Sequence, residues 1–267
     1  LSGKVVYLLV VANGHGFVKD VWQEIWPESS IDAKGGYIII LLSALMFHLS
    51  GLLSSRLHPS AAINSPWRWK NISISFLHSL ISGPWAVLCF HKTPKMAEDL
   101  ISTYSSFSYV LVSVSVGYFL YDMLDMIVCQ RTWQSLELVG HHIVVIACYM
   151  VAVTTKLYVG YAVVGLLVEL NSIFLHLRQL MQICGFAKTS ACYRLNSLLN
   201  LGTFIVFRIL LLAWMTRWIV INRDFVPLIF YSLGSVGLAI MTMMNIILFY
   251  RLLRSDFFNR KDKISKT

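Results

Sequence analysis

The chain has 267 residues, of which 57% are hydrophobic and 13% are charged, with a mean hydropathy of +0.68 and a formal net charge of +9. Soluble domains carry about 45–50% apolar and about 25% charged residues, so this composition excludes a disordered chain, a coiled coil and a collagen-like chain, and it argues against a water-soluble core. Several membrane spans of about 20 residues each fit both the length and the composition. The sequence therefore predicts a polytopic membrane protein.

Seven apolar stretches follow one another behind an N-terminal segment, residues 1–34, whose origin and function the sequence does not assign. The stretches are continuous rather than alternating, and lipid leaves no partner for an open backbone, so they predict helices rather than barrel strands. In chain order they are Tyr37–Leu53, Ile72–Phe90, Ser106–Val128, Leu138–Val153, Leu157–Ile183, Leu198–Ile221 and Pro227–Leu252. We expect an all-α transmembrane bundle of about six to seven spans, because the first stretch is the shortest.

The expected organisation has four parts. They are the N-terminal segment 1–34, a first span 35–56, a main membrane domain 65–258 and a basic tail 259–267. Thirteen of the 22 lysine and arginine residues fall in one set of loops and in the tail, whereas five fall in the opposite loops. Because positive residues favour the cytosolic side, we expect a cytosolic C-terminus. The acceptor sequence at Asn71 then lies at the cytosolic edge, and we expect it to be unmodified.

Ionisable side chains inside the spans form two stripes that lie in the same half of the predicted bilayer. Asp122 and Asp125 are i,i+3 neighbours, and Glu169, Ser172 and His176 share one helix face. Such residues usually face an interior cavity or a partner. We therefore predict a polar cavity that opens to the cytosol; the alternative is a set of buried hydrogen bonds that lock the bundle. The expected cavity lining is His78, Asp122, Asp125, Ser172, His176 and Arg208.

Arg208 lies near the middle of the sixth stretch. An unpaired charge at that depth costs at least about 2.5 kcal/mol on insertion scales. We therefore predict a carboxylate partner for it, namely Glu169, which lies at a similar depth.

The adjacent pair His141 and His142 carries the catalytic hypothesis. A neutral imidazole beside an acid can act as a general base or as a nucleophile, so His141, His142 and Glu169 are the candidate catalytic residues if the protein is an enzyme. A diiron site would need a further histidine at the position of Leu138, and the five cysteines are scattered without a CxxC pair. The sequence therefore predicts no metal site and no disulfide framework.

Several motifs in order resemble those of the TLC domain family. They are Trp67-Arg-Trp-Lys-Asn71, Phe76-Leu-His78-Ser79, Gly117-Tyr-Phe-Leu-Tyr-Asp122-Met-Leu-Asp125, His141-His142 and Leu166-Leu-Val-Glu169-Leu-Asn171-Ser172-Ile-Phe-Leu-His176-Leu-Arg178. The resemblance covers residues 36–258 and implies a bundle of membrane helices around a lipid-accessible cavity. It identifies the main membrane domain, residues 65–258, as the TLC domain.

The resemblance also bears on catalysis. In the ceramide synthases of this superfamily, paired histidines and a His-Asp-x-Ser-Asp motif on the next helix make up the acyl-transfer site. This chain keeps the paired histidines, but Val168, Glu169, Asn171 and Ser172 stand where that motif has histidine, aspartate, serine and aspartate. The second motif is degenerate, so the resemblance favours a protein without ceramide synthase activity.

The resemblance implies control of phospholipid composition and fluidity at the plasma membrane, by limiting the incorporation of long polyunsaturated acyl chains into phospholipids. The expected partners are membrane lipids, as phospholipids or fatty-acyl chains, and not nucleic acids; no cofactor is expected. The alternative is a membrane-embedded acyltransferase that uses His142, Glu169 and acyl-CoA, and the endoplasmic reticulum is the alternative location. A seven-helix receptor is disfavoured because the third stretch ends without Asp-Arg-Tyr, whereas a proton-coupled transporter stays open.

Overall fold

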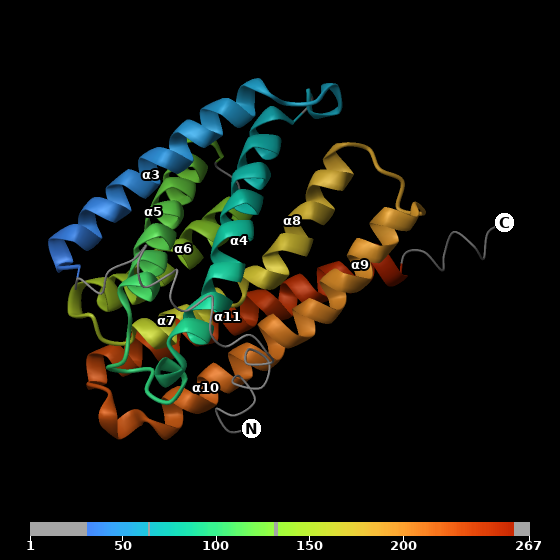
Figure 1. Cartoon of the computed structure of the whole chain (residues 1–267). Helices are drawn as coiled ribbons and strands as arrows, with labels where there is room; N and C mark the ends of the chain where they lie inside the picture. Colours follow the sequence, from blue (N-terminus) through green and yellow to red (C-terminus); the bar gives the residue numbers. More distant parts are fainter. Residues whose placement is uncertain (1–30, 64, 131–132, 259–267) are drawn as a thin grey trace.

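The computed structural model describes residues 31–63, 65–130 and 133–258, and every regular element in these ranges is a helix (Figure 1). The long elements are α3 Ala33–Arg56, α4 Pro66–Lys92, α5 Ser106–Cys129, α6 Trp133–Thr155, α7 Val159–Leu166, α8 Glu169–Ile183, α9 Ala191–Phe204, α10 Leu211–Ile221 and α11 Leu228–Leu253. The short helical turns are η1 Ser60–Ala62, η2 Pro94–Ala97, η3 Ile205–Leu210, η4 Arg223–Phe225 and η5 Arg254–Phe258.

These elements form seven stretches that are long and apolar enough to cross a membrane, which confirms the predicted all-α fold and its span count within the described residues. The segments 1–30 and 259–267, which include most of the predicted N-terminal segment and the whole basic tail, lie outside the described residues. On one side of the bundle, α4 and α9 begin and α5, α8 and α11 end. This side carries Lys70, Arg178 and Lys188. We call this side of the bundle the basic end; its cytosolic placement stays a prediction.

The fifth and sixth spans are not single regular helices. In the fifth, the N–H groups of Leu167 and Val168 bond back by only three residues, and α8 starts again at Glu169. Gly83 of α4 packs against this break, since a Cβ there would lie 3.1 Å from the backbone nitrogen of Leu170. In the sixth, α9 passes through the π-helical turn η3 into α10. Such wide turns are rare and often mark functional sites; Arg208 lies in this one.

Helix α3 lies along α5 (Figure 1). Gly36 and Gly51 on α3 face tyrosine hydroxyls of α5, and Ser43 Oγ donates to the carbonyl of Val114 at 2.8 Å. Gly117 on α5 lies against the α3 backbone, since a Cβ there would be 2.5 Å from the carbonyl oxygen of Ile40. Because lipid tails are as apolar as leucine, membrane helices associate through such close backbone packing. Small residues therefore hold the first span against the rest of the bundle.

Candidate functional site

The first two turns of α4 bind both carboxylates of the α5 stripe. Lys70 Nζ lies 2.5 Å from Asp125 Oδ1, and Trp67 Nε1 donates to Asp125 Oδ2 at 2.9 Å. One residue further along, Asn71 Nδ2 donates to Asp122 Oδ1 at 2.5 Å. Two carboxylates that the sequence assigned to the cavity lining are therefore bound by side chains of a neighbouring helix. They join α4 to α5 at the basic end.

Asp122 also contacts His142, whose Nε2 lies 3.1 Å from Asp122 Oδ2. The other ring nitrogen, Nδ1, lies 2.7 Å from the carbonyl oxygen of Leu138. A carbonyl only accepts, so Nδ1 must carry a proton and donate it. A second proton must then lie between Nε2 and the carboxylate. His142 is 6% exposed, and in this arrangement neither of its nitrogens offers a free lone pair to a substrate.

The predicted catalytic pairing is corrected by these contacts. The acyltransferase alternative pairs His142 with Glu169, but the carboxylate in contact with His142 is that of Asp122. Glu169 Oε2 lies 3.9 Å from Nδ1 of His78 instead. The sequence analysis predicted that these acids and histidines lie close together, but it paired Glu169 with the wrong histidine.

His78 lies in an aromatic cage at the centre of the cluster. The ring is 1% exposed and stacks on Tyr118 with centroids 3.9 Å apart, and its Nε2 lies 3.3 Å from Ser115 Oγ. Its Nδ1 has no hydrogen-bond partner in the described part of the chain, and the same holds for Nδ1 of His141 and of His176. Within the described residues no three His, Cys, Asp or Glu side chains gather as metal ligands. The cluster is therefore a buried polar core with unsatisfied imidazole nitrogens.

Arg208 is 9% exposed and points into the bundle, but the expected ion pair with Glu169 is absent among the described residues. Its Nε donates to Asn171 Oδ1 at 2.6 Å, Nη1 donates to Asn245 Oδ1 at 2.9 Å, and Nη2 donates to Ser172 Oγ at 2.8 Å. The prediction that a carboxylate contacts Arg208 is therefore wrong. Three neutral oxygens from α8 and α11 accept the hydrogen bonds of the guanidinium instead. Ser172, predicted as cavity lining, serves as one of these acceptors.

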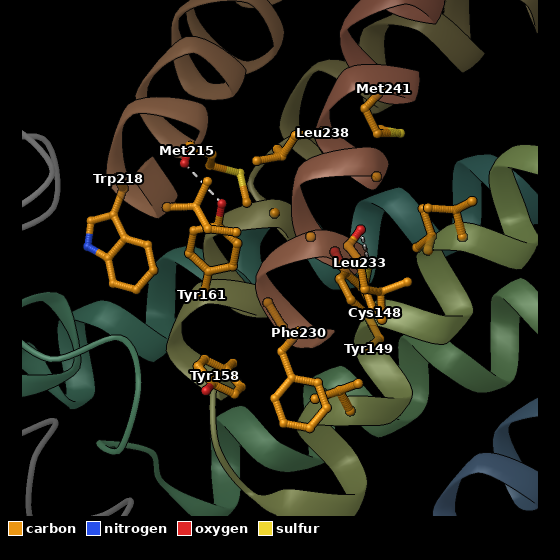
Figure 2. Close-up of a pocket in the computed structure, with 18 of the residues that line it drawn as sticks. Cys148, Tyr149, Tyr158, Tyr161, Met215, Trp218, Phe230, Leu233, Leu238 and Met241 are labelled. Carbon is orange, nitrogen blue, oxygen red and sulfur yellow. Dashed lines mark hydrogen bonds between the residues drawn. The ribbon is translucent and has the colours of Figure 1, made fainter. Parts of the chain in front are cut away.

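A separate apolar cavity of about 140 Å³ lies between α6, α7, α10 and α11 (Figure 2). Tyr161 donates its hydroxyl proton to the carbonyl of Met215 at 3.0 Å and packs on Trp218 with centroids 4.8 Å apart. Tyr158, in the connection before α7, and Phe230, in the first turn of α11, have rings 5.9 Å apart and lie at the end away from the basic end. None of the six predicted lining residues lines this cavity. Its residues are ordinary apolar ones, so the sequence held no signal for it.

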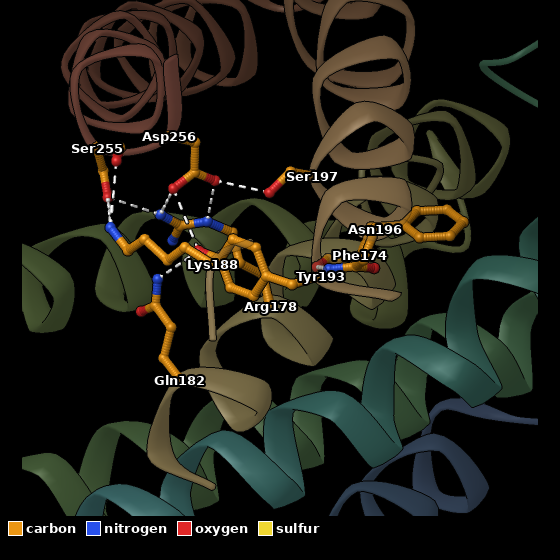
Figure 3. A network of polar contacts seen from close by, with 9 residues as sticks. All are labelled: Phe174, Arg178, Gln182, Lys188, Tyr193, Asn196, Ser197, Ser255 and Asp256. Atoms are coloured by element: carbon orange, nitrogen blue, oxygen red, sulfur yellow. Dashed lines mark hydrogen bonds and ion pairs between the residues drawn. The ribbon is translucent and has the colours of Figure 1, made fainter. Parts of the chain in front are cut away.

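A third feature joins the ends of α8, α9 and η5 at the basic end (Figure 3). Arg178 binds Asp256 with two nitrogens, Nε to Oδ2 at 2.6 Å and Nη2 to Oδ1 at 2.5 Å, and Ser197 Oγ donates to the same carboxylate at 2.9 Å. Lys188 Nζ donates to the carbonyl of Ser255 at 3.2 Å. Sequence reasoning missed this network; its signal in the sequence is Asp256, an acid that follows two arginines near the C-terminus.

Comparison with known proteins agrees with this architecture. A family model described as the TLC domain matches residues 68–254. TLC domain-containing protein 2 of Danio rerio is 62% identical over 199 residues, which cover 74% of this chain and 80% of that protein. TLC domain-containing protein 2 of Homo sapiens is 40% identical, covering 74% and 75%. TLC domain-containing protein 1 of Mus musculus is 38% identical, covering 72% and 76%.

Proposed function

The chain belongs to the TLC domain family of multi-pass membrane proteins, and from that premise we propose that it regulates the phospholipid composition and fluidity of the plasma membrane. It does so by limiting the incorporation of long polyunsaturated acyl chains into phospholipids. It acts on lipids through binding, and its partners are phospholipids or fatty-acyl chains.

The apolar cavity between α6, α7, α10 and α11 is the observation that carries this proposal. Its lining is almost wholly apolar, with aromatic rings at the end away from the basic end. Lipid tails are as apolar as this lining, so hydrophobicity alone does not draw a chain from the bilayer into the cavity. Selection must come from shape. At about 140 Å³ the cavity has room for a segment of an acyl chain. A narrow cavity walled by rigid rings accepts one segment geometry better than another, and this supports discrimination between saturated and polyunsaturated chains.

The polar cluster supports binding rather than turnover. An acyl-transfer reaction through His142 needs a free nitrogen that attacks or removes a proton, but both nitrogens of His142 face oxygen atoms of the protein. Glu169, the second residue of the acyltransferase alternative, contacts His78 instead. We therefore assign the cluster to holding α4, α5, α6 and α8 together.

Cellular lipid analysis tests the proposal with two matched variants on α11. Leu233 lines the cavity, whereas Val236 is 57% exposed and lies outside it. Cells that lack the gene are complemented with the wild type, Leu233→Trp or Val236→Trp. We expect the wild type and Val236→Trp to lower the polyunsaturated share of phospholipid acyl chains, and Leu233→Trp to fail at equal expression. If all three proteins lower the polyunsaturated share equally, the cavity is not needed for the function.

Glu169→Gln separates binding from catalysis, because it removes the carboxylate and changes the side-chain volume little. We expect this variant to restore phospholipid composition as the wild type does. Loss of the effect at normal expression and location would favour the acyltransferase alternative.

A further inference from the structure

Arg208 carries a buried positive charge that no carboxylate contacts among the described residues. A guanidinium has five N–H donors, and the three acceptors that Arg208 binds are the neutral oxygens of Asn171, Ser172 and Asn245. These bonds leave one N–H on each terminal nitrogen without an acceptor in the described part of the chain. Glu169 acts on the charge only from a longer distance and contacts His78. A buried charge held this way is costly, so a bound anion would stabilise it.

The local backbone makes this arginine unusual in a second way. Arg208 lies in the π-helical turn η3, near the middle of the span Ala191–Ile221. A π turn widens the helix and shifts the direction of the following side chains, and it is frequently found at functional sites. The flanking segments α9 and α10 are regular helices, so the irregular turn is confined to the residues around the charge.

Arg208 and Asn245 line one end of a groove of about 680 Å³ between α10 and α11. The groove continues to Val220 on α10 and Tyr231 on α11, at the end of the bundle away from the basic end. From Arg208 to Val220 it runs for about 18 Å at about 1.5 Å per residue. This length is close to half of the hydrocarbon core, about 15 Å, which is the depth that the acyl chains of one leaflet fill. The groove therefore combines a charge at one end with the length of a lipid tail.

We propose that this groove binds a long-chain fatty acid, with the carboxylate on Arg208 and the chain lying between α10 and α11. A carboxylate matches the fork of two guanidinium N–H groups, and a single unbranched chain fits a narrow cleft between two helices. The fatty acid neutralises the arginine, and the arginine in turn holds a carboxylate at a depth where lipid alone would not.

The volume of the groove favours this occupant over a membrane helix of a partner protein. Small-molecule sites have volumes of about 300–1,000 Å³, and the groove falls within this range. A helix about 18 Å long, the length of the groove, and about 10 Å wide would occupy roughly 1,400 Å³. The groove would enclose less than half of such a helix. It is also a different cavity from the one that carries the proposed function, so the two proposals stand or fall separately.

Photo-crosslinking in phosphatidylcholine nanodiscs tests the site, with palmitic acid that carries a diazirine in its chain as the probe. We expect the probe to label residues of α10 and α11, and unlabelled palmitic acid, but not methyl palmitate, to compete. Arg208→Gln should reduce labelling roughly tenfold or more, the factor that one lost charge-assisted hydrogen bond corresponds to. Ala239→Trp fills the groove from an exposed position and leaves the arginine in place, so it should reduce labelling equally.

Val236→Trp, on the same helix but outside the groove, is the matched control and should label as the wild type does. If Arg208→Gln fails to fold, Ala239→Trp decides the result. Competition by methyl palmitate as strong as by the acid would overturn the proposal, as would undiminished labelling in Ala239→Trp. Labelling of the groove by a diazirine-bearing phosphatidylcholine but not by the acid would assign the groove to a bilayer phospholipid. Co-purification of a membrane protein that crosslinks to α10 and α11 and is not displaced by palmitic acid would also overturn it.

Discussion

Replacing Gly117 with alanine should loosen the first span from the rest of the bundle. The added Cβ would lie 2.5 Å from the carbonyl oxygen of Ile40 and 2.7 Å from Cβ of Ser43, whereas ordinary contacts begin at 3.4 Å. The gap to the carbonyl is therefore about 0.9 Å too short. Because that neighbour is backbone of α3, no side-chain rotation relieves the clash, and α3 and α5 must move apart.

The expected cost follows from the energetics of overpacking. Inserting a methyl group into a well-packed contact costs about 1–3 kcal/mol. For a chain of this size each kcal/mol corresponds to about 2–4 °C in Tm, so Gly117→Ala should lower the Tm of the purified protein by about 2–12 °C. Gly202 of α9 is the control. It is exposed, and a Cβ there meets no described residue within 4 Å. Gly202→Ala should therefore leave the Tm unchanged or raise it, because alanine favours a helix over glycine.

The assay is thermal unfolding in one detergent, followed by the fraction of monodisperse protein after heating. A Gly117→Ala protein as stable as Gly202→Ala would refute the close packing of α3 on α5. The same measurement on the chain without the first span would show whether the loss comes from that contact, since the substitution should then have no effect.

Three further outcomes are expected. Asp122→Asn should lower the free energy of unfolding by about 3–5 kcal/mol, because it leaves the proton shared with His142 without its carboxylate; a double-mutant cycle with His142→Gln should show strong coupling, and additive effects would contradict the contact. Asp256→Asn should release the end of α11 from Arg178, seen as faster tryptic cleavage in that segment than in the wild type, and unchanged cleavage would contradict the network. The hydroxyl of a nearby serine holds the pKa of Asp99, in the loop after α4, below its usual range. The ionised Asp99 should therefore stabilise the fold above the ordinary carboxyl pKa of about 3.9, and this stabilisation should be lost as the pH falls through the lower pKa of the folded protein. The difference in unfolding free energy between the wild type and Asp99→Asn should vanish in acid, and a difference that grows in acid would contradict the prediction.

Hydrophobic length was sufficient to place the spans, but not to describe their interior. The stretch Leu157–Ile183 contains no proline, and yet the helix breaks before Glu169. Helix α4 approaches this break closely at Gly83, a tertiary contact that a local pattern does not contain. In the same way, nothing in the sequence around Arg208 distinguishes a π-helical turn from a regular one.

The polar cluster was predictable in its membership and not in its pairing. Depth along a helix is known from residue counting, so Asp122, His142, Glu169 and His78 could all be placed in one half of the bundle. Rotation about each helix axis and the neighbours of each helix decide which acid meets which histidine, and both depend on packing. Asp256 shows the opposite case, because it lies beyond the last apolar stretch and only the fold brings it to Arg178.

The most direct test of the central claim is mass spectrometry of the lipids that co-purify with the protein. The claim is that the cavity between α6, α7, α10 and α11 discriminates between acyl chains. The wild type and Val236→Trp should retain acyl lipid whose degree of unsaturation differs from that of the source membrane, and Leu233→Trp should lose this difference. Bound lipid with the composition of the surrounding membrane in all three proteins would contradict the account.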